Sequence, residues 1–131
     1  MEEDMGTETG FTWLKEKEEA GAQLCVRSGI LVIQMHTDLD HHNALWIREQ
    51  ADKMIERQNV KHILFDFTGV EFMDSSGIGV IMGRYKKVIF TGGKAAVCNV
   101  GSAVDRIMRM SGLYKIIEKY DNLEEALKGL C

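Results

Sequence analysis

The residues of this chain with the clearest potential for chemistry form the short polar run Asp74-Ser75-Ser76-Gly77. The run follows an apolar segment and a loop, and residues with helical spacing come after it, so its hydroxyls are expected at the solvent-facing first turn of a helix. Amides in a first turn have no partner within the helix, and Asp and Ser side chains commonly accept hydrogen bonds from them. Residue chemistry alone therefore favours simple helix capping.

Two reactive roles compete with capping at Ser76. A hydrolytic nucleophile needs a general base within hydrogen-bonding distance, and the surrounding residues do not form a Gly-x-Ser-x-Gly pattern. A phosphoacceptor needs only an accessible hydroxyl, and a phosphate of charge about −1.5 to −2 is stabilised at the positive end of a helix. Without further information, Ser75 and Ser76 are equally suitable acceptors.

The histidines do not predict a metal site. His41 and His42 are adjacent, and neighbours on a helix point about 100° apart, so the two rings are badly placed to hold one ion. His36 and His62 fall on different predicted strands without a carboxylate or thiol in a ligand pattern. Polar residues at a helix start, on a surface that contacts a partner, explain His41 and His42 better.

Nucleotide and disulfide patterns are also missing. Thr91-Gly92-Gly93-Lys94 resembles the end of a P-loop, but Val88 stands where the first glycine is needed and Ala95 where a Ser or Thr is needed. The three cysteines are far apart and include no Cys-x-x-Cys pair, which disfavours both a disulfide framework and a zinc site (Cys25, Cys98 and Cys131). We therefore expect neither a cofactor nor a metal.

Charge is concentrated at one end of the 131-residue chain. The formal net charge is −4, and residues 1–20 carry seven acidic residues and two lysines, so the rest is nearly neutral. A neutral body lacks the field that attracts phosphate backbones, so nucleic acid is not an expected partner. No apolar run approaches the roughly 18 to 20 residues of a membrane helix, and the acidic start is unlike a signal peptide. A cytoplasmic protein is expected.

The composition predicts one folded domain, at 23–131, preceded by an acidic extension at 1–22. The extension is expected to be mobile, or to dock Phe11 and Trp13 through an edge strand or a short helix.

Hydrophobic periodicity predicts alternating strands and helices in the domain. Strands are expected at 24–26, 30–35, 62–67 and 95–98, with a short one at Ile116-Ile117, and the first two form a hairpin about Ser28-Gly29. Helices are expected at about 42–58 after Asp40, from near Asp74, up to Ser111-Gly112, and after Asp121 or Asn122. The second helix is expected to present Ile78, Ile81, Met82, Tyr85 and Ile89 on one side. This order predicts an α/β fold with a mixed sheet of four to five strands and four helices.

Three segments together resemble the STAS domain of bacterial anti-sigma factor antagonists, most closely the sporulation type. They are His62-Ile-Leu-Phe-Asp-Phe, the run from Phe72 to Lys86 that contains the serine motif, and Met110-Ser-Gly-Leu. Leu39-Asp40-His41-His42 matches the segment that precedes the first helix in this subgroup. The resemblance covers about residues 23–130.

The resemblance implies a phosphorylation switch. The unmodified domain is expected to bind an anti-sigma factor that is also a serine kinase, which frees the sigma factor. That kinase is expected to phosphorylate the second serine of the motif, Ser76, after which the domain dissociates and a serine phosphatase restores it. The chain itself is then no enzyme. The residues expected to contact the partner are Asp40, His41, His42, Asp74, Ser75, Ser76 and Gly77.

An alternative within the same fold is a STAS scaffold subunit of a stress-signalling assembly or a transporter-ATPase complex. Such a subunit would keep the serine turn and differ in its partner.

Overall fold

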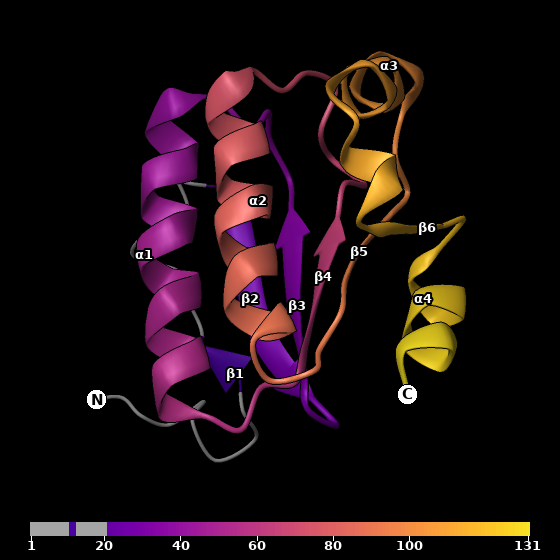
Figure 1. Cartoon of the computed structure of the whole chain (residues 1–131). Helices are drawn as coiled ribbons and strands as arrows, with labels where there is room; N and C mark the ends of the chain where they lie inside the picture. Colours follow the sequence, from indigo (N-terminus) through magenta and orange to yellow (C-terminus); the bar gives the residue numbers. More distant parts are fainter. Residues whose placement is uncertain (1–10, 13–20) are drawn as a thin grey trace.

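The computed structural model describes residues 11–12 and 21–131, which form a mixed sheet with helices on both faces (Figure 1). The strands, in sheet order, are β1 Phe11–Thr12, β2 Ala22–Arg27, β3 Ile30–Met35, β4 His62–Asp66, β5 Ala95–Cys98 and β6 Glu118–Tyr120. The helices are α1 His41–Arg57, α2 Ser75–Ile89, α3 Ser102–Ser111 and α4 Leu123–Leu130, with a 3₁₀ turn at Leu113–Lys115. The predicted α/β class is confirmed. In the described residues the sheet has one strand more than the five expected, the two-residue edge strand β1.

The predicted hairpin about Ser28 and Gly29 is confirmed. Strands β2 and β3 are antiparallel, with Arg27 opposite Ile30. Both turn residues have positive φ angles, 51° for Ser28 and 80° for Gly29, which suit the tight two-residue turns that connect twisted strands. Beyond β2, the edge strand β1 pairs Phe11 with Cys25. Residues 1–10 and 13–20, with the expected docking of Trp13, lie outside the described residues.

Strands β3 to β6 run parallel to one another, with β4 between β3 and β5. Leu64 and Phe65 of β4 point to opposite faces and are both fully buried, as expected for a central strand. Because β3 and β4 are parallel, the chain leaves both at the same edge of the sheet, and α1 and α2 start after the loops there (Figure 1).

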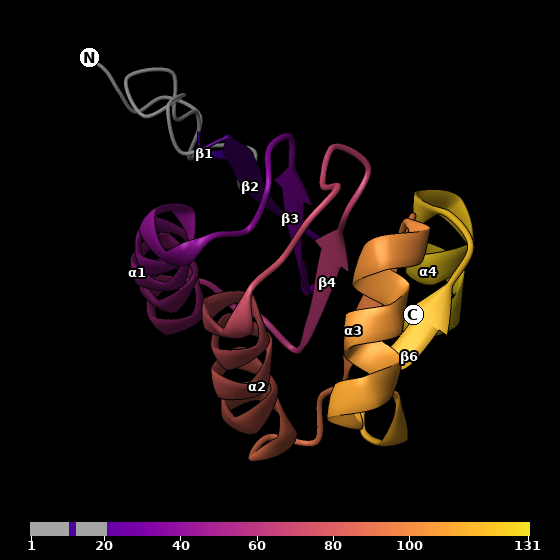
Figure 2. The ribbon, with the colours of Figure 1, turned by 90° about the horizontal axis from the view of Figure 1, so that it is seen from above.

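The two faces of the sheet belong to two separate apolar clusters. Seen from above, α1, α2 and α3 lie on one side of the sheet and α4 on the other (Figure 2). Ile33 and Phe65 pack toward the first three helices, whereas Val32 and Leu64 pack toward Ala126 of α4. This alternation follows from the two-residue period of strands, and it places the same apolar face of the sheet beneath both α1 and α2.

The short strand predicted at Ile116-Ile117 is wrong by one to two residues, because β6 begins at Glu118. The amides of Ile116 and Ile117 both donate to the carbonyl of Leu113 and close the 3₁₀ turn, so they are not available to a strand. The side chain of Ile117 is buried, which explains the apolar signal.

The apolar side predicted for α2 is confirmed except at Ile89, since Ile78, Met82 and Tyr85 pack against the core that contains Ile81. Ile81 is fully buried, but Ile89 is half exposed, whereas Arg84 is only 5% exposed. A hydrophobic pattern cannot reveal a buried arginine, because the arginine is held by an acidic residue of another helix. The buried residues of α2 are Gly77, Val80, Ile81, Arg84 and Val88.

Candidate functional site

The starts of α1 and α2 lie side by side. Leu39 and Met73, the residues before the two N-caps, form an isolated parallel β-bridge. The Leu39 amide donates to the carbonyl of Phe72 at 3.1 Å, and the Asp74 amide donates to the carbonyl of Leu39 at 3.3 Å. Two segments far apart in the sequence are thereby held at a defined spacing.

Each of the two helices is capped by an aspartate, as predicted. Oδ1 of Asp40 accepts the amide of Asn43 at 3.0 Å, and Oδ1 of Asp74 accepts the amide of Ser76 at 2.8 Å. Both cap residues have extended backbone angles. These side chains satisfy amides that the helices leave unpaired, so capping and any further role of the site coexist.

Asp38 attaches the loop before α2 to the segment before α1. Its Oδ1 atom accepts the amides of Glu71 at 2.9 Å and of Phe72 at 3.0 Å. The sequence did not predict a role for Asp38, because its partners lie more than 30 residues away. In the sequence, Asp38 stands out only as an acidic residue two positions before Asp40.

Gly77 allows the two helix starts to pack closely. A Cβ atom at Gly77 would overlap the side chain of Met73 and lie 2.9 Å from Cδ2 of Leu39. Leu39 and Met73 are themselves fully buried. The glycine of the serine motif is therefore required by packing beneath the bridge.

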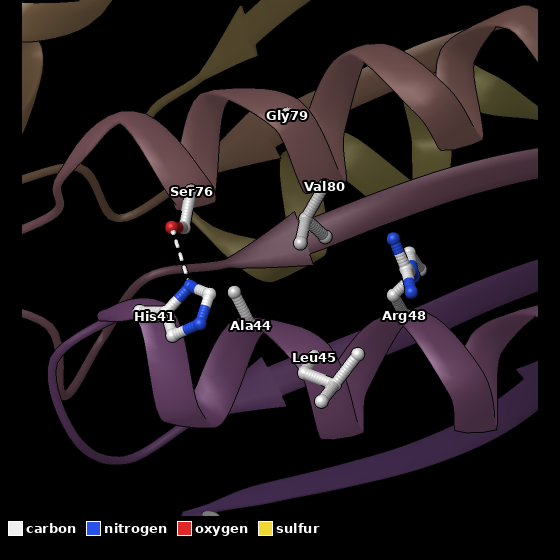
Figure 3. A pocket seen from close by; sticks show the side chains of 7 residues that line it. All are labelled: His41, Ala44, Leu45, Arg48, Ser76, Gly79 and Val80. Carbon is white, nitrogen blue, oxygen red and sulfur yellow. Dashed lines mark hydrogen bonds between the residues drawn. The ribbon is translucent and has the colours of Figure 1, made fainter.

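The hydroxyl of Ser76 faces α1. Its Oγ atom lies 3.3 Å from Nδ1 of His41, a hydrogen bond between the first turns of the two helices (Figure 3). Ser76 is half-buried, and Ser75 and His42 are exposed. Of the two hydroxyls in the motif, that of Ser76 alone lines the groove between the helices.

This groove has a volume of about 280 Å³. Its lining residues are His41, Ala44, Leu45 and Arg48 of α1, with Ser76, Gly79 and Val80 of α2. Figure 3 shows Ser76 and His41 facing each other at one end and Arg48 extending from α1 toward α2 at the other. The groove thus combines an apolar middle with polar groups at its two ends.

The buried carboxylate of Asp66 supports the loop that follows β4. Asp66, at the end of β4, accepts hydrogen bonds from Thr68, Asn99 and Gln34. Burial alone would raise the pKa of Asp66, but these hydrogen bonds outweigh it and lower the pKa below the usual value. Asp66 therefore fixes the turn through which the chain leaves β4.

Comparison with known proteins confirms the likeness to STAS domains. The family model of the STAS domain matches residues 22–126. The chain belongs to the STAS domain family. An anti-sigma F factor antagonist of Paenibacillus polymyxa is 45% identical over 102 residues, which are 78% of this chain and 87% of that protein. Within the family, this STAS domain falls among the anti-sigma factor antagonists.

Two solved structures of the anti-sigma factor antagonist SpoIIAA share the fold. The structure of the unphosphorylated form is 28% identical, with a TM-score of 0.68, and the match covers 82% of this chain and 94% of that one. The phosphorylated form, from Bacillus, is 29% identical, with the same TM-score, over 84% and 99% of the two chains.

The seven residues predicted to contact a partner fall into three groups in this STAS domain. His41 and Ser76 point into the groove, whereas Ser75 and His42 are exposed beside it. The rest have structural contacts of their own: Asp40 and Asp74 cap the helices, and Gly77 lies beneath them. Leu45 and Arg48 of the groove were missed, because nothing in the sequence distinguishes them from other polar-face residues of a helix.

Within residues 11–12 and 21–131, no cluster of three His, Cys, Asp or Glu side chains is arranged to hold a metal ion. Cys25 and Cys98 are buried thiols and Cys131 is an exposed one. None of the helices in the described part of the STAS domain has the length and apolarity needed to cross a membrane.

Proposed function

We propose that this STAS domain binds a kinase-type anti-sigma factor in its unmodified form and thereby releases a sigma factor. Phosphorylation of Ser76 by that same kinase then switches binding off. The observation that carries the proposal is the position of Oγ of Ser76, half-buried between two helix starts and facing a groove. A hydroxyl at this place is open to a kinase and adjoins the surface that a partner would cover.

The environment favours Ser76 over Ser75 as the acceptor. The amide of Ser76 is held by Asp74, and its hydroxyl is held by His41, so its direction is set. Ser75 is exposed and makes no side-chain hydrogen bond within the described residues. A fixed hydroxyl lowers the entropy cost of aligning the acceptor with ATP.

The proposed reaction is phosphoryl transfer from ATP. Oγ of Ser76 attacks the γ-phosphorus, the new O–P bond forms, and the bond to the bridging oxygen of ADP breaks. The hydroxyl proton passes to a base of the kinase. The chain is the substrate in this scheme and not the catalyst, and hydrolysis of the phosphoserine by a serine phosphatase returns the starting state.

A phosphate at Ser76 would weaken docking through charge. It adds about −1.5 to −2 charges close to the carboxylates of Asp40 and Asp74. An interface formed over these residues would have to bury repelling charges, which costs several kcal/mol. We expect Asp40, His41, His42 and the Asp74–Gly77 turn to form that interface.

The relatives support a switch of this kind. SpoIIAA has been solved in an unphosphorylated and a phosphorylated form, and both match this chain with the same TM-score. A shared fold in the two forms favours a local change of charge over a refolding of the domain. Because sigma factors and ATP are found in the cytoplasm, we place the protein there.

Mass spectrometry of the full chain after incubation with its cognate anti-sigma factor and ATP tests the proposal. One phosphate should appear, and peptide analysis should place it on Ser76. Ser76→Ala should abolish the reaction, and the matched variant Ser75→Ala should retain it. Continued labelling of Ser76→Ala would overturn the assignment.

A binding measurement tests the second half of the proposal. Ser76→Asp should weaken binding to the anti-sigma factor by about 1 to 3 kcal/mol, the usual size of such a coupling. Equal affinities of the phosphorylated and unmodified forms would contradict the switch. Recovery of a transporter ATPase and no kinase in a pull-down would support the scaffold alternative instead.

A further inference from the structure

We propose that the groove between α1 and α2 receives the phosphoryl group of phosphorylated Ser76, with His41 and Arg48 of α1 as its intramolecular partners. The inference rests on the proposed function, which puts the phosphate on Ser76 and leaves open where it lies afterwards. It assigns the groove a second role, as the site that holds the switch in its off state.

His41 is already within reach of the acceptor atom. Its Nδ1 atom lies 3.3 Å from Oγ of Ser76, and a phosphate adds three oxygens beyond that atom. A ring nitrogen so close to Oγ can donate a hydrogen bond to a phosphate oxygen after small rotations. The existing hydrogen bond therefore marks the direction in which the phosphate is received.

Arg48 supplies the charge. It lies seven residues after His41, which places both side chains on the same face of α1. In Figure 3, Arg48 lies beyond Val80, which is itself one helical turn, or about 6 Å, after Ser76 on α2, so the long side chain of Arg48 has to turn back toward Ser76 to reach a phosphate there. Arg48 is exposed and makes no ion pair with any residue that the structure describes. An exposed guanidinium on a long side chain is well suited to pair with a phosphate.

The groove has room for the group. Its volume is about 280 Å³, and an added Cβ at Gly79 would meet no atom within 4 Å. Ala44 and Val80 form its middle, and none of its lining residues is acidic. A phosphate can therefore enter without displacing a packed residue or meeting a like charge.

The carboxylates on the other side of Ser76 also favour a phosphate that points into the groove. The Asp74 carboxylate is held against the start of α2 by the amide of Ser76, and the Asp40 carboxylate caps α1. Both repel a phosphate, whereas Arg48 attracts it from the groove. The phosphorylated form then has a filled groove as well as a changed charge, and the exposed side chain of Leu45 is less accessible to a partner.

The second ionisation of the phosphate reports whether Arg48 is its partner. Phosphoserine can be inserted at position 76 of the full chain during translation, and its pKa read from ³¹P chemical shifts. A phosphoserine alone has a second pKa of about 6. With Arg48 and His41 in place, we expect a pKa about one unit lower, at the low end of the shift that an arginine causes in an adjacent acid.

Three variants separate the groove from the helix start. Arg48→Met and His41→Asn should each move the phosphate pKa back toward 6, because they remove one partner and leave the helix start intact. Arg106→Met changes an exposed arginine on α3, far from the groove, and should leave the value unchanged. The same midpoint in Arg48→Met and Arg106→Met would overturn the inference.

This design distinguishes the two proposals. If the kinase fails to modify Ser76, the proposed function fails, and the titration of the inserted phosphoserine still decides where the phosphate lies. If the kinase modifies Ser76 and Arg48→Met leaves the titration unchanged, the function stands and the groove is not the receiving site.

Discussion

Arg84 of α2 lies with its Nε atom 2.9 Å from Oδ1 of Asp52 on α1. The two side chains are 6% and 26% exposed, and Nη1 of Arg84 also donates to the carbonyl of Val80. The contact is an ion pair by distance rather than a well-aligned hydrogen bond. Because α1 carries His41 and α2 carries Ser76, this ion pair joins the two walls of the groove.

Arg84→Met should lower the free energy of unfolding by about 2 to 3 kcal/mol, somewhat less than a fully buried pair, because it leaves Asp52 without its near partner. Urea denaturation measures the change. Lys87→Met is the matched control, since Lys87 lies 4.0 Å from the same oxygen and is exposed, so its loss should cost less than about 1 kcal/mol. Equal effects of the two variants would show that the ion pair with Arg84 does not hold the helices together.

Gly77→Ala and Gly79→Ala should have opposite effects on stability, although they lie two residues apart. A Cβ at Gly77 would overlap Met73, and overpacking of this kind costs about 1 to 3 kcal/mol. A Cβ at Gly79 meets open space, and alanine there should stabilise α2 by up to about 1 kcal/mol. Thermal unfolding of both variants checks this, and a stabilising Gly77→Ala would contradict the packing beneath the bridge.

Asp38→Ala should loosen the loop before α2, because it removes the acceptor for the amides of Glu71 and Phe72. We expect a loss of about 1 kcal/mol in the free energy of unfolding and faster hydrogen exchange at those two amides. Asp38→Asn retains an oxygen acceptor and should restore most of the protection. Unchanged exchange in Asp38→Ala would show that the loop is held by other contacts.

Acid should destabilise the fold in part through Asp105. Hydrogen bonds from Lys119 and Tyr114 lower the pKa of Asp105 to about 2, from 3.8 in an unperturbed side chain. The unfolded chain therefore binds the proton first, so this contribution is present above about pH 4 and is lost as the pH falls toward 2.

In Asp105→Asn, stability should be lower at neutral pH and should fall less steeply between pH 4 and 2. Denaturation curves across this range provide the measurement. Asp121→Asn, at an exposed acid before α4, is the control and should keep the slope of the parent protein. A parent-like slope in Asp105→Asn would refute the role of this carboxylate.

Much of the fold was predictable because it depends on interactions between near neighbours in the chain. The Ser28-Gly29 turn needs residues that tolerate positive φ, and the caps Asp40 and Asp74 bond to amides two or three residues away. Such signals are complete within a few residues. The error at Ile116-Ile117 arose because a local turn captured amides that an apolar pattern had assigned to a strand.

The sequence by itself therefore determined the α/β order, the capped helix starts and the serine motif, whose likeness to STAS domains predicts a phosphorylation switch. Only the tertiary structure decided that Ser76 faces His41, 35 residues away, that Asp38 holds the opposite loop, and that Arg84 is buried against Asp52. These contacts depend on which strands become neighbours and on how closely two helices approach each other. No single segment carries that information, because it arises when the apolar faces of distant segments are buried together.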